Sequence, residues 1–248
     1  MSKPRIGLQL WTVRELLSAD FAGTLAAVSA AGYDAVEFAG NYGQKPPTDL
    51  AALLSELNLK CCGLHSNIAE LRDPSSNTYA YARALGAKHL TVSMPSAVQK
   101  DCLGAIKDIV QAAEAVKQQG YVFTYHNHAA EFDRVNGEYA LDLIFERTSP
   151  DTVKAELDTY WIRKGGADPV AFIRKYSDRM PQLHLKDMDG EDESFAEVGE
   201  GCLDMKGILA AASQSAVEWL IVEQDKCKRD PLESIRISID NLKGLLAS

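Results

Sequence analysis

The sequence has few cysteines and no long hydrophobic run, and both features narrow what the chain can be. Its five cysteines form no C-x-x-C pair, so we expect reduced packing residues rather than a disulfide framework or a structural zinc site. No segment approaches the ~18 apolar residues of a membrane span. The first ten residues also lack the apolar stretch of a signal peptide. We therefore predict a cytoplasmic protein that does not enter a membrane.

Basic residues are also in deficit. There are 26 Lys and Arg against 35 Asp and Glu, which gives a formal net charge of −9. Nucleic-acid partners usually require a basic face, so this balance argues against one. An anionic small substrate stays open, because a metal ion or a lysine can dominate a small site. The segment Gly7-Leu8-Gln9 is not a dinucleotide-binding fingerprint, so the first apolar run is not followed by a phosphate loop.

Strand-like and helix-like segments alternate along the 248 residues. The eight candidate strands are Arg5–Leu10, Ala35–Phe38, Leu59–His65, His89–Ser93, Tyr121–Tyr125, Val153–Leu157, Gln182–Lys186 and Trp219–Glu223. The candidate helices are Phe21–Ala31, Leu50–Leu57, Tyr79–Leu85, Leu103–Gln118, Tyr139–Arg147, Pro169–Tyr176, Met205–Ser213 and Leu232–Leu246. Gly32, Gly86 and Gly120 follow three of these helices, where a left-handed C-cap turns the chain back. The alternation predicts an α/β fold, a single (β/α)₈ TIM barrel, with a doubly wound open sheet as the alternative.

Polar residues gather at the carboxyl ends of the predicted strands, where barrels of this type carry their active sites. They are Gln9, Trp11, Glu37, His65, Asn67, the run 125–128, Glu131, the run 156–161, the run 184–187 and the run 223–225. Four of the five histidines belong to this set. The fifth, His89, begins its strand, and we assign it no function.

Four of these residues form a mixed set of nitrogen and oxygen ligands: His126, Asp158, His184 and Glu223. Carboxylates at the mouth of an apolar barrel are costly unless they are paired or ligated. The donor types suit one divalent ion of Mn²⁺, Zn²⁺, Co²⁺ or Fe²⁺ better than Mg²⁺ or Ca²⁺. His128 competes with His126 for the position on the fifth strand. Ordinary hydrogen bonding is the alternative for each residue.

Several motifs together resemble a known family. They are Gly7-Leu8-Gln9-Leu10-Trp11, the segments 32–37, 125–132, 157–161, 184–187 and 198–201, and Val222-Glu223-Gln224-Asp225. In order and placement the chain resembles the xylose isomerase-like superfamily of sugar isomerases and epimerases, which includes relatives of endonuclease IV. The resemblance implies that residues 1–248 form one barrel domain of carbohydrate metabolism. It also implies one divalent metal at the ends of strands 5 to 8, commonly held by Glu, Asp, His and Glu. Asp158, His184 and Glu223 match the last three.

The fifth strand departs from this pattern, because His126 stands where the family's ketose epimerases carry a glutamate that also transfers a proton. An imidazole that ligates a metal cannot also accept that proton. We expect Glu131 to act as a substitute base or to bind a substrate hydroxyl, with a structural hydrogen bond as the alternative. Glu223 is the other candidate base, and Lys186 could stabilise an enolate oxygen or bind a carboxylate or phosphate.

Five further residues are candidates for substrate binding: Trp11, His65, His128, Trp161 and Glu200. Trp161 would offer a flat face to the C–H groups of a sugar, with core packing as the alternative. Asp187 alternates to the other face of its strand from Lys186, so we expect a structural role.

The predicted function is a metal-dependent sugar isomerase or epimerase that removes a proton next to a carbonyl. The partner would be a small sugar or keto-sugar, and a homo-oligomer stays open. The same enolate could expel a β-substituent, so a keto-sugar lyase or dehydratase is the nearest alternative. An endonuclease IV-like phosphodiesterase would need more histidines and a basic surface. A non-catalytic sugar-binding barrel is the remaining alternative.

Overall fold

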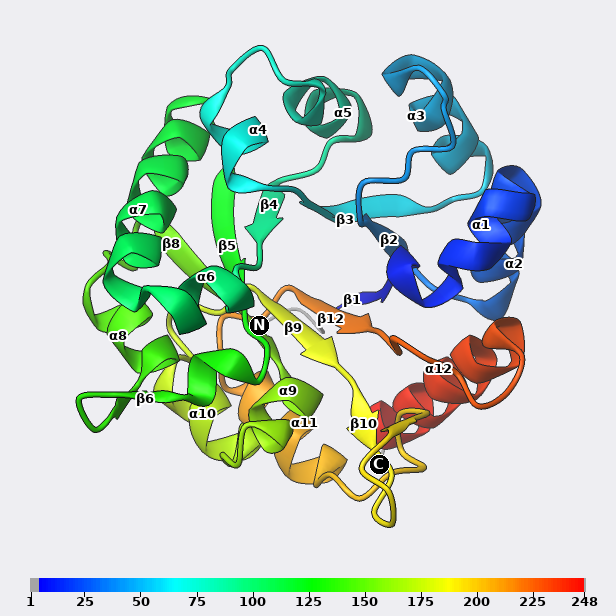
Figure 1. The fold of residues 1–248 in the computed structure, drawn as a ribbon. Coiled ribbons are helices and arrows are strands. Elements are labelled where there is room, and N and C mark those ends of the chain that lie inside the picture. The colour runs from blue at the N-terminus through cyan, green and yellow to red at the C-terminus, as the bar shows by residue number, and fades with distance from the viewer. Residues whose placement is uncertain (1–4, 248) are drawn as a thin grey trace.

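The computed structural model describes residues 5–247, in which eight parallel strands close into a barrel surrounded by helices (Figure 1). Around the barrel the strands follow the order β1-β12-β9-β8-β5-β4-β3-β2. Their bounds are β1 Arg5–Gln9, β2 Ala35–Phe38, β3 Lys60–His65, β4 His89–Val92, β5 Val122–His126, β8 Val153–Asp158, β9 Gln182–Leu185 and β12 Trp219–Val222. Each agrees with a predicted strand to within one residue at either end. The (β/α)₈ barrel is confirmed, and the open-sheet alternative is wrong.

The outer helices also follow the prediction. They are α2 Phe21–Ala31, α3 Pro47–Glu56, α5 Asn77–Leu85, α7 Cys102–Gln118, α8 Ala140–Glu146, α10 Pro169–Lys175, α11 Met205–Ser213 and α12 Pro231–Ala247. Gly32 and Gly86 are the C-caps of α2 and α5, with φ of 95° and 64°. Because only glycine adopts such angles without strain, the predicted turn chemistry is confirmed at both positions. None of the helices in residues 5–247 is long and apolar enough to cross a membrane.

The elements that the sequence did not predict all follow the carboxyl end of a barrel strand. They are η1 Leu10–Val13, α1 Arg14–Ala19, α4 Ile68–Arg72, α6 Pro95–Lys100, η2 Ala130–Phe132, α9 Thr159–Lys164, and the two-residue strands β6 Arg134–Val135, β7 Glu138–Tyr139, β10 Asp187–Met188 and β11 Phe195–Ala196. Segments this short show too little periodicity to be recognised. They build up the face of the barrel on which the strands end.

The interior of the barrel is unusually polar. Barrels of this fold are commonly filled by branched apolar side chains. Here the Gln182 side chain on β9 donates to Glu37 on β2 at 3.2 Å and accepts from Thr124 on β5 at 3.3 Å. Because β9 is not a neighbour of β2 or β5, these bonds cross the interior. Gly63 makes room for them, since a Cβ there would lie 2.4 Å from the Glu37 carboxylate.

Most of the apolar core lies between the strands and the helices, where Leu8, Leu64, Leu157 and Leu183 are fully buried. All five cysteines are free. Cys61, Cys62 and Cys102 are buried, as the prediction of packing residues requires. The prediction is wrong for Cys202, which is exposed, and only partly right for Cys227, which is half-buried. Both follow the late strands, where the connecting segments are open to solvent.

Candidate active site

Four side chains from the last strands of the barrel meet at its carboxyl end. His126 ends β5, Asp158 ends β8, His184 lies in β9 and Glu223 directly follows β12. Each offers one ligand atom, and these atoms lie within 4.8 Å of one another. All four residues are buried. The structure therefore brings together the four residues that the sequence singled out as metal ligands, which we call the rim group.

The Asp158 carboxylate shows that the rim group fits a cation. Its Oδ1 accepts the backbone N–H of Trp161 at 2.9 Å, which caps α9. Its Oδ2 is buried and accepts no hydrogen bond from residues 5–247. Around Oδ2 lie His126 Nε2 at 3.8 Å, His184 Nδ1 at 4.0 Å and Lys186 Nζ at 3.2 Å. A buried carboxylate oxygen in these surroundings favours a bound cation, and the mixed donors suit Zn²⁺, Mn²⁺, Fe²⁺ or Co²⁺.

Two buried carboxylates contact the Nε2 side of the His184 ring. Its Nδ1 faces Glu223 at 2.9 Å, and its Nε2 lies 2.7 Å from both Glu37 and Glu156. Burial alone would lower the pKa of His184, but Glu156 and Glu37 outweigh it and hold that pKa well above the ordinary value. A carboxylate on one imidazole nitrogen fixes the tautomer and directs the other nitrogen toward a metal. Glu37 and Glu156 thus orient a proposed ligand.

Lys186 is enclosed by three carboxylates. Its Nζ lies 3.2 Å from Asp158, 2.8 Å from Glu223 and 2.7 Å from Asp225. Burial would lower the pKa of Lys186, but these carboxylates raise it above the ordinary value. In the same way burial would raise the pKa of Glu223, but Lys186 and His184 hold it below the usual range. Lys186 and Glu223 are therefore a charged pair at the rim.

His128 lies two residues beyond the end of β5, outside the rim group. Its Nδ1 is 2.8 Å from the Ser93 hydroxyl, and its ring centroid is 5.0 Å from that of Trp161. Burial lowers the pKa of His128 to about 4, with Lys186 adding to the effect, so the ring is neutral near pH 7. Trp161 is half-buried, and its ring centroid lies 5.5 Å from Lys186 Nζ.

His65 and Trp11 lie on other sides of the barrel mouth. His65 Nε2 approaches Glu37 at 3.2 Å and Glu156 at 3.3 Å, so this residue reaches into the barrel. It also lines a cleft of about 460 Å³ with Tyr42, Asn67, Glu70 and Tyr81 among its other walls. Trp11 is 44% exposed and stacks against Arg14.

Glu131 is not directed at the rim group. Its Oε1 accepts the Tyr125 hydroxyl at 2.7 Å, and its Oε2 accepts the His128 backbone N–H at 3.0 Å. Successive residues of a strand point to opposite faces, so Tyr125 lies on the outer side of β5 when His126 points inward. Burial raises the pKa of Glu131, and Tyr125 partly offsets this. These contacts favour the structural alternative, in which Glu131 fixes the segment after β5.

Glu200 and Asp187 also lie outside the rim group. Glu200 is exposed and pairs with Arg229 at 2.8 Å. Asp187 is buried, and its carboxylate accepts four backbone N–H groups, those of Met188, Gly199, Gly201 and Leu203. Asp187 therefore anchors the segment that carries Glu200, which agrees with the structural role expected for it.

Comparison with known proteins identifies the family. Residues 25–245 match the family model described as the xylose isomerase-like TIM barrel. The chain belongs to this family. Among curated relatives, the inosose dehydratase of Lacticaseibacillus casei is 24% identical over 250 aligned positions, which cover 83% of each chain. The predicted resemblance is therefore confirmed.

Solved structures of other proteins share the fold of this chain. A sugar phosphate isomerase/epimerase from Parabacteroides distasonis superimposes with a TM-score of 0.85 at 22% identity, covering 98% of this chain and 94% of that one. An IolI protein with a bound zinc atom superimposes with a TM-score of 0.76 at 13% identity, covering 98% of each chain. At these identities the likeness establishes the xylose isomerase-like fold.

Glu37 and Glu156 are the site residues to which sequence reasoning gave no role. Glu37 lies one residue before the end of β2 and Glu156 two residues before the end of β8, so both belonged to the polar set at the carboxyl face. A usable signal was present for Glu156, because it lies two residues before Asp158 and so shares its side of the strand. For Glu37, the signal would have been a second carboxylate in an interior that this fold normally fills with apolar residues.

Proposed function

We propose that the chain is a metal-dependent dehydratase of a keto-sugar or keto-cyclitol. It would remove a proton next to a carbonyl and expel the hydroxyl group from the adjacent carbon. The observation that carries the proposal is the contact of 2.8 Å between Glu223 and Lys186, a base and an acid side by side at the rim group. The inosose dehydratase relatives support the same reaction class.

The proposed metal ligands are His126, Asp158, His184 and Glu223, with Glu37 and Glu156 orienting His184. The buried Asp158 Oδ2 and the zinc atom in the IolI neighbour support such an ion. Zn²⁺, Mn²⁺, Co²⁺ and Fe²⁺ suit the donor set better than Mg²⁺. When bound, a divalent ion supplies Lewis-acid stabilisation of the developing enolate oxygen.

The proton transfers follow from the charge states of Glu223 and Lys186. Glu223 is held ionised by Lys186 and His184, so it can accept the α-proton. The electron pair of the broken C–H bond forms a carbon–carbon double bond, and the bond to the leaving hydroxyl breaks. Lys186 is held protonated and donates a proton to that hydroxyl, which departs as water. Glu223 then returns its proton to Lys186 across their contact, so the net change is the loss of one water molecule.

The placement of Glu131 favours elimination over epimerisation. An epimerase must return a proton to the same carbon from the opposite face, which the family's ketose epimerases accomplish with a second carboxylate on strand 5. In this chain His126 occupies that position, and Glu131 is bonded to Tyr125 behind the strand. Elimination needs only one base and one acid, which Glu223 and Lys186 supply.

The substrate would lie between Trp161 and the cleft beside His65. Trp161 and His128 form an apolar, neutral wall suited to the C–H face of a polyhydroxylated ring. A volume of about 460 Å³ beside His65 lies within the usual range of small-molecule sites. Trp11, exposed in η1 just after β1, is a further surface against which a ring could stack.

A sugar isomerase or epimerase is the second candidate. It is supported by the likeness to the sugar phosphate isomerase/epimerase from Parabacteroides distasonis and by the neutral His128 on the strand-5 side of the rim group. In that reaction Glu223 would remove the α-proton, and His128 rather than Glu131 would exchange it on the other face.

Product analysis separates these reactions. The protein, loaded with Mn²⁺ or Zn²⁺, is incubated in D₂O with a panel of inososes and keto-sugars, and the products are identified by NMR. The proposed function predicts a dehydrated, unsaturated ketone and its tautomers. A deuterated stereoisomer would replace the dehydratase with the second candidate. Recovery of every compound unchanged and without deuterium, despite binding, would contradict both and favour a sugar-binding barrel.

A further inference from the structure

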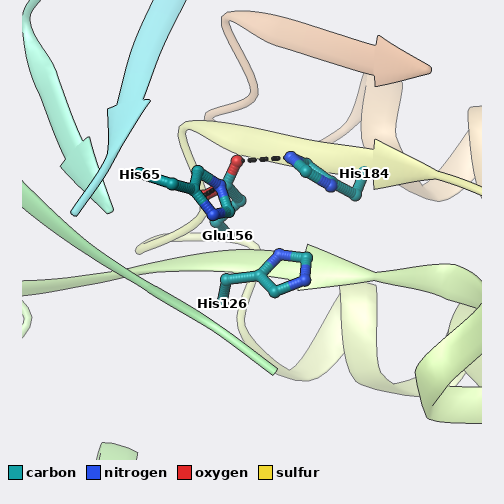
Figure 2. A group of neighbouring side chains, drawn as sticks. All are labelled: His65, His126, Glu156 and His184. Carbon is teal, nitrogen blue, oxygen red and sulfur yellow. Dashed lines mark ion pairs between the residues drawn. The ribbon is translucent and has the colours of Figure 1, made fainter. Parts of the chain in front are cut away.

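A second group of metal-binding side chains lies deeper in the barrel. His65 on β3, His126 on β5, Glu156 on β8 and His184 on β9 each offer a ligand atom, all within 4.8 Å of one another. Figure 2 shows the four side chains gathered around a common space from four different strands. We call these four residues the deep group. It shares His126 and His184 with the rim group, and its other two members are His65 and Glu156 instead of Asp158 and Glu223.

The surroundings of Glu156 are an independent indication that this group is a metal site. Its side chain is fully buried, and within residues 5–247 its two oxygens pair only with histidine rings and accept no hydrogen bond from a backbone N–H, a hydroxyl or an amide. Its oxygens lie 2.7 Å from His184 Nε2 and 3.3 Å from His65 Nε2. The hydrogen bond of His184 Nε2 goes instead to Glu37, at 2.7 Å. The nitrogen of His65 that faces Glu156 is likewise buried without a hydrogen bond.

The balance of charge points the same way. Five carboxylates surround the two groups: Glu37, Glu156, Asp158, Glu223 and Asp225. In the described part of the chain, Lys186 is the one Lys or Arg that pairs with any of them. With every histidine neutral, one divalent ion would leave a formal charge of −2 in a buried site, which is costly. A proton on His65, which pairs with Glu37 and Glu156, would offset only one of these two charges. A second divalent ion neutralises it.

We propose that the barrel binds two divalent ions, one in the rim group and one in the deep group. The rim ion takes Asp158, His184 and Glu223. His126 belongs to both groups; when both ions are bound it joins His65 and Glu156 on the deep ion, so that no side chain serves both. Glu37 remains the hydrogen-bond acceptor of His184. Each ion then has three protein ligands, the number at which a catalytic zinc keeps a position open. The deep site stands on the interior contacts and does not depend on the proposed reaction.

Metal stoichiometry tests the deep site without measuring activity. The wild-type protein and its variants are dialysed to equilibrium against Zn²⁺ alone, and bound zinc is counted by mass spectrometry. The wild type should hold two equivalents. Glu156→Gln should hold one, and Asp158→Asn should hold one. His65→Gln, at a partly exposed position, should also lose one equivalent and covers the case in which Glu156→Gln fails to fold. His128→Gln, outside both groups, is the matched control and should keep two.

A single equivalent in the wild type would overturn the deep site. Two equivalents of zinc that remain bound in both Glu156→Gln and His65→Gln would also overturn it. The loss of both equivalents in either variant, if that variant is folded, would do the same. A single equivalent that disappears only in Asp158→Asn would leave the proposed function intact. Two equivalents in a protein that acts on no keto-sugar would support the deep site and contradict that function.

Discussion

Glu223→Gln should slow exchange of the substrate α-proton with D₂O by about 10²-fold or more, the usual contribution of a positioned base. The amide has nearly the same shape as the carboxylate, but it cannot accept the proton. Exchange is measured by NMR on a ketone that the wild type converts. Because Glu223 is also a proposed ligand, the metal content of the variant is measured at the same time, and exchange is compared at saturating metal.

Glu131→Gln is the matched control for this experiment. It makes the same chemical change at a carboxylate bonded to the Tyr125 hydroxyl and the His128 backbone. We expect it to keep its metal and to exchange the α-proton at nearly the wild-type rate. It should lose about 1–3 kcal/mol of folding stability, because the amide cannot satisfy both donors as the carboxylate does. A large loss of exchange in Glu131→Gln, with Glu223→Gln unaffected, would transfer the role of base to Glu131.

His126→Ala should weaken metal binding by about 100-fold or more, whereas His128→Ala should change it only slightly. Loss of a direct ligand is expected to exceed the 10–100-fold cost of losing a residue that merely orients one. His126 belongs to both metal-binding groups, whereas His128 bonds Ser93 and lies against Trp161. Affinities are obtained by titrating metal-free protein with Zn²⁺ in competition with a chelator. A loss confined to His128→Ala would mean that the ligand position on strand 5 lies one alternation, or two residues, further along the chain than His126.

Much of this site could be predicted from the sequence because a parallel barrel makes strand order and strand ends informative. Every strand of such a barrel ends at the same face, so His126, Asp158, His184 and Glu223 had to approach one another once their strands were located. The period of two then assigned Lys186 to the side of His184 and Asp187 to the other. Both assignments agree with the contacts of these residues.

The directions of side chains beyond the strands could not be predicted in this way. Glu131 and Glu200 lie in connecting segments, where no period fixes orientation, and their partners Tyr125 and Arg229 are defined only by the folded chain. The polar interior was also missed. The strand that carries Glu37 has only four residues, so from the sequence this carboxylate is assigned to the rim of the barrel. Only its contact with Gln182 across the barrel shows that it is enclosed.

Anomalous diffraction from crystals grown with Zn²⁺ tests the central claim most directly. Data collected on both sides of the zinc absorption edge locate the ion itself, independently of any assay. The rim group predicts a strong peak bounded by Asp158 Oδ2, His184 Nδ1 and the Glu223 carboxylate. Saturating zinc that gives no peak there, with density only at exposed carboxylates or only among His65, His126 and Glu156, would contradict a metal-assisted reaction at the rim of this barrel.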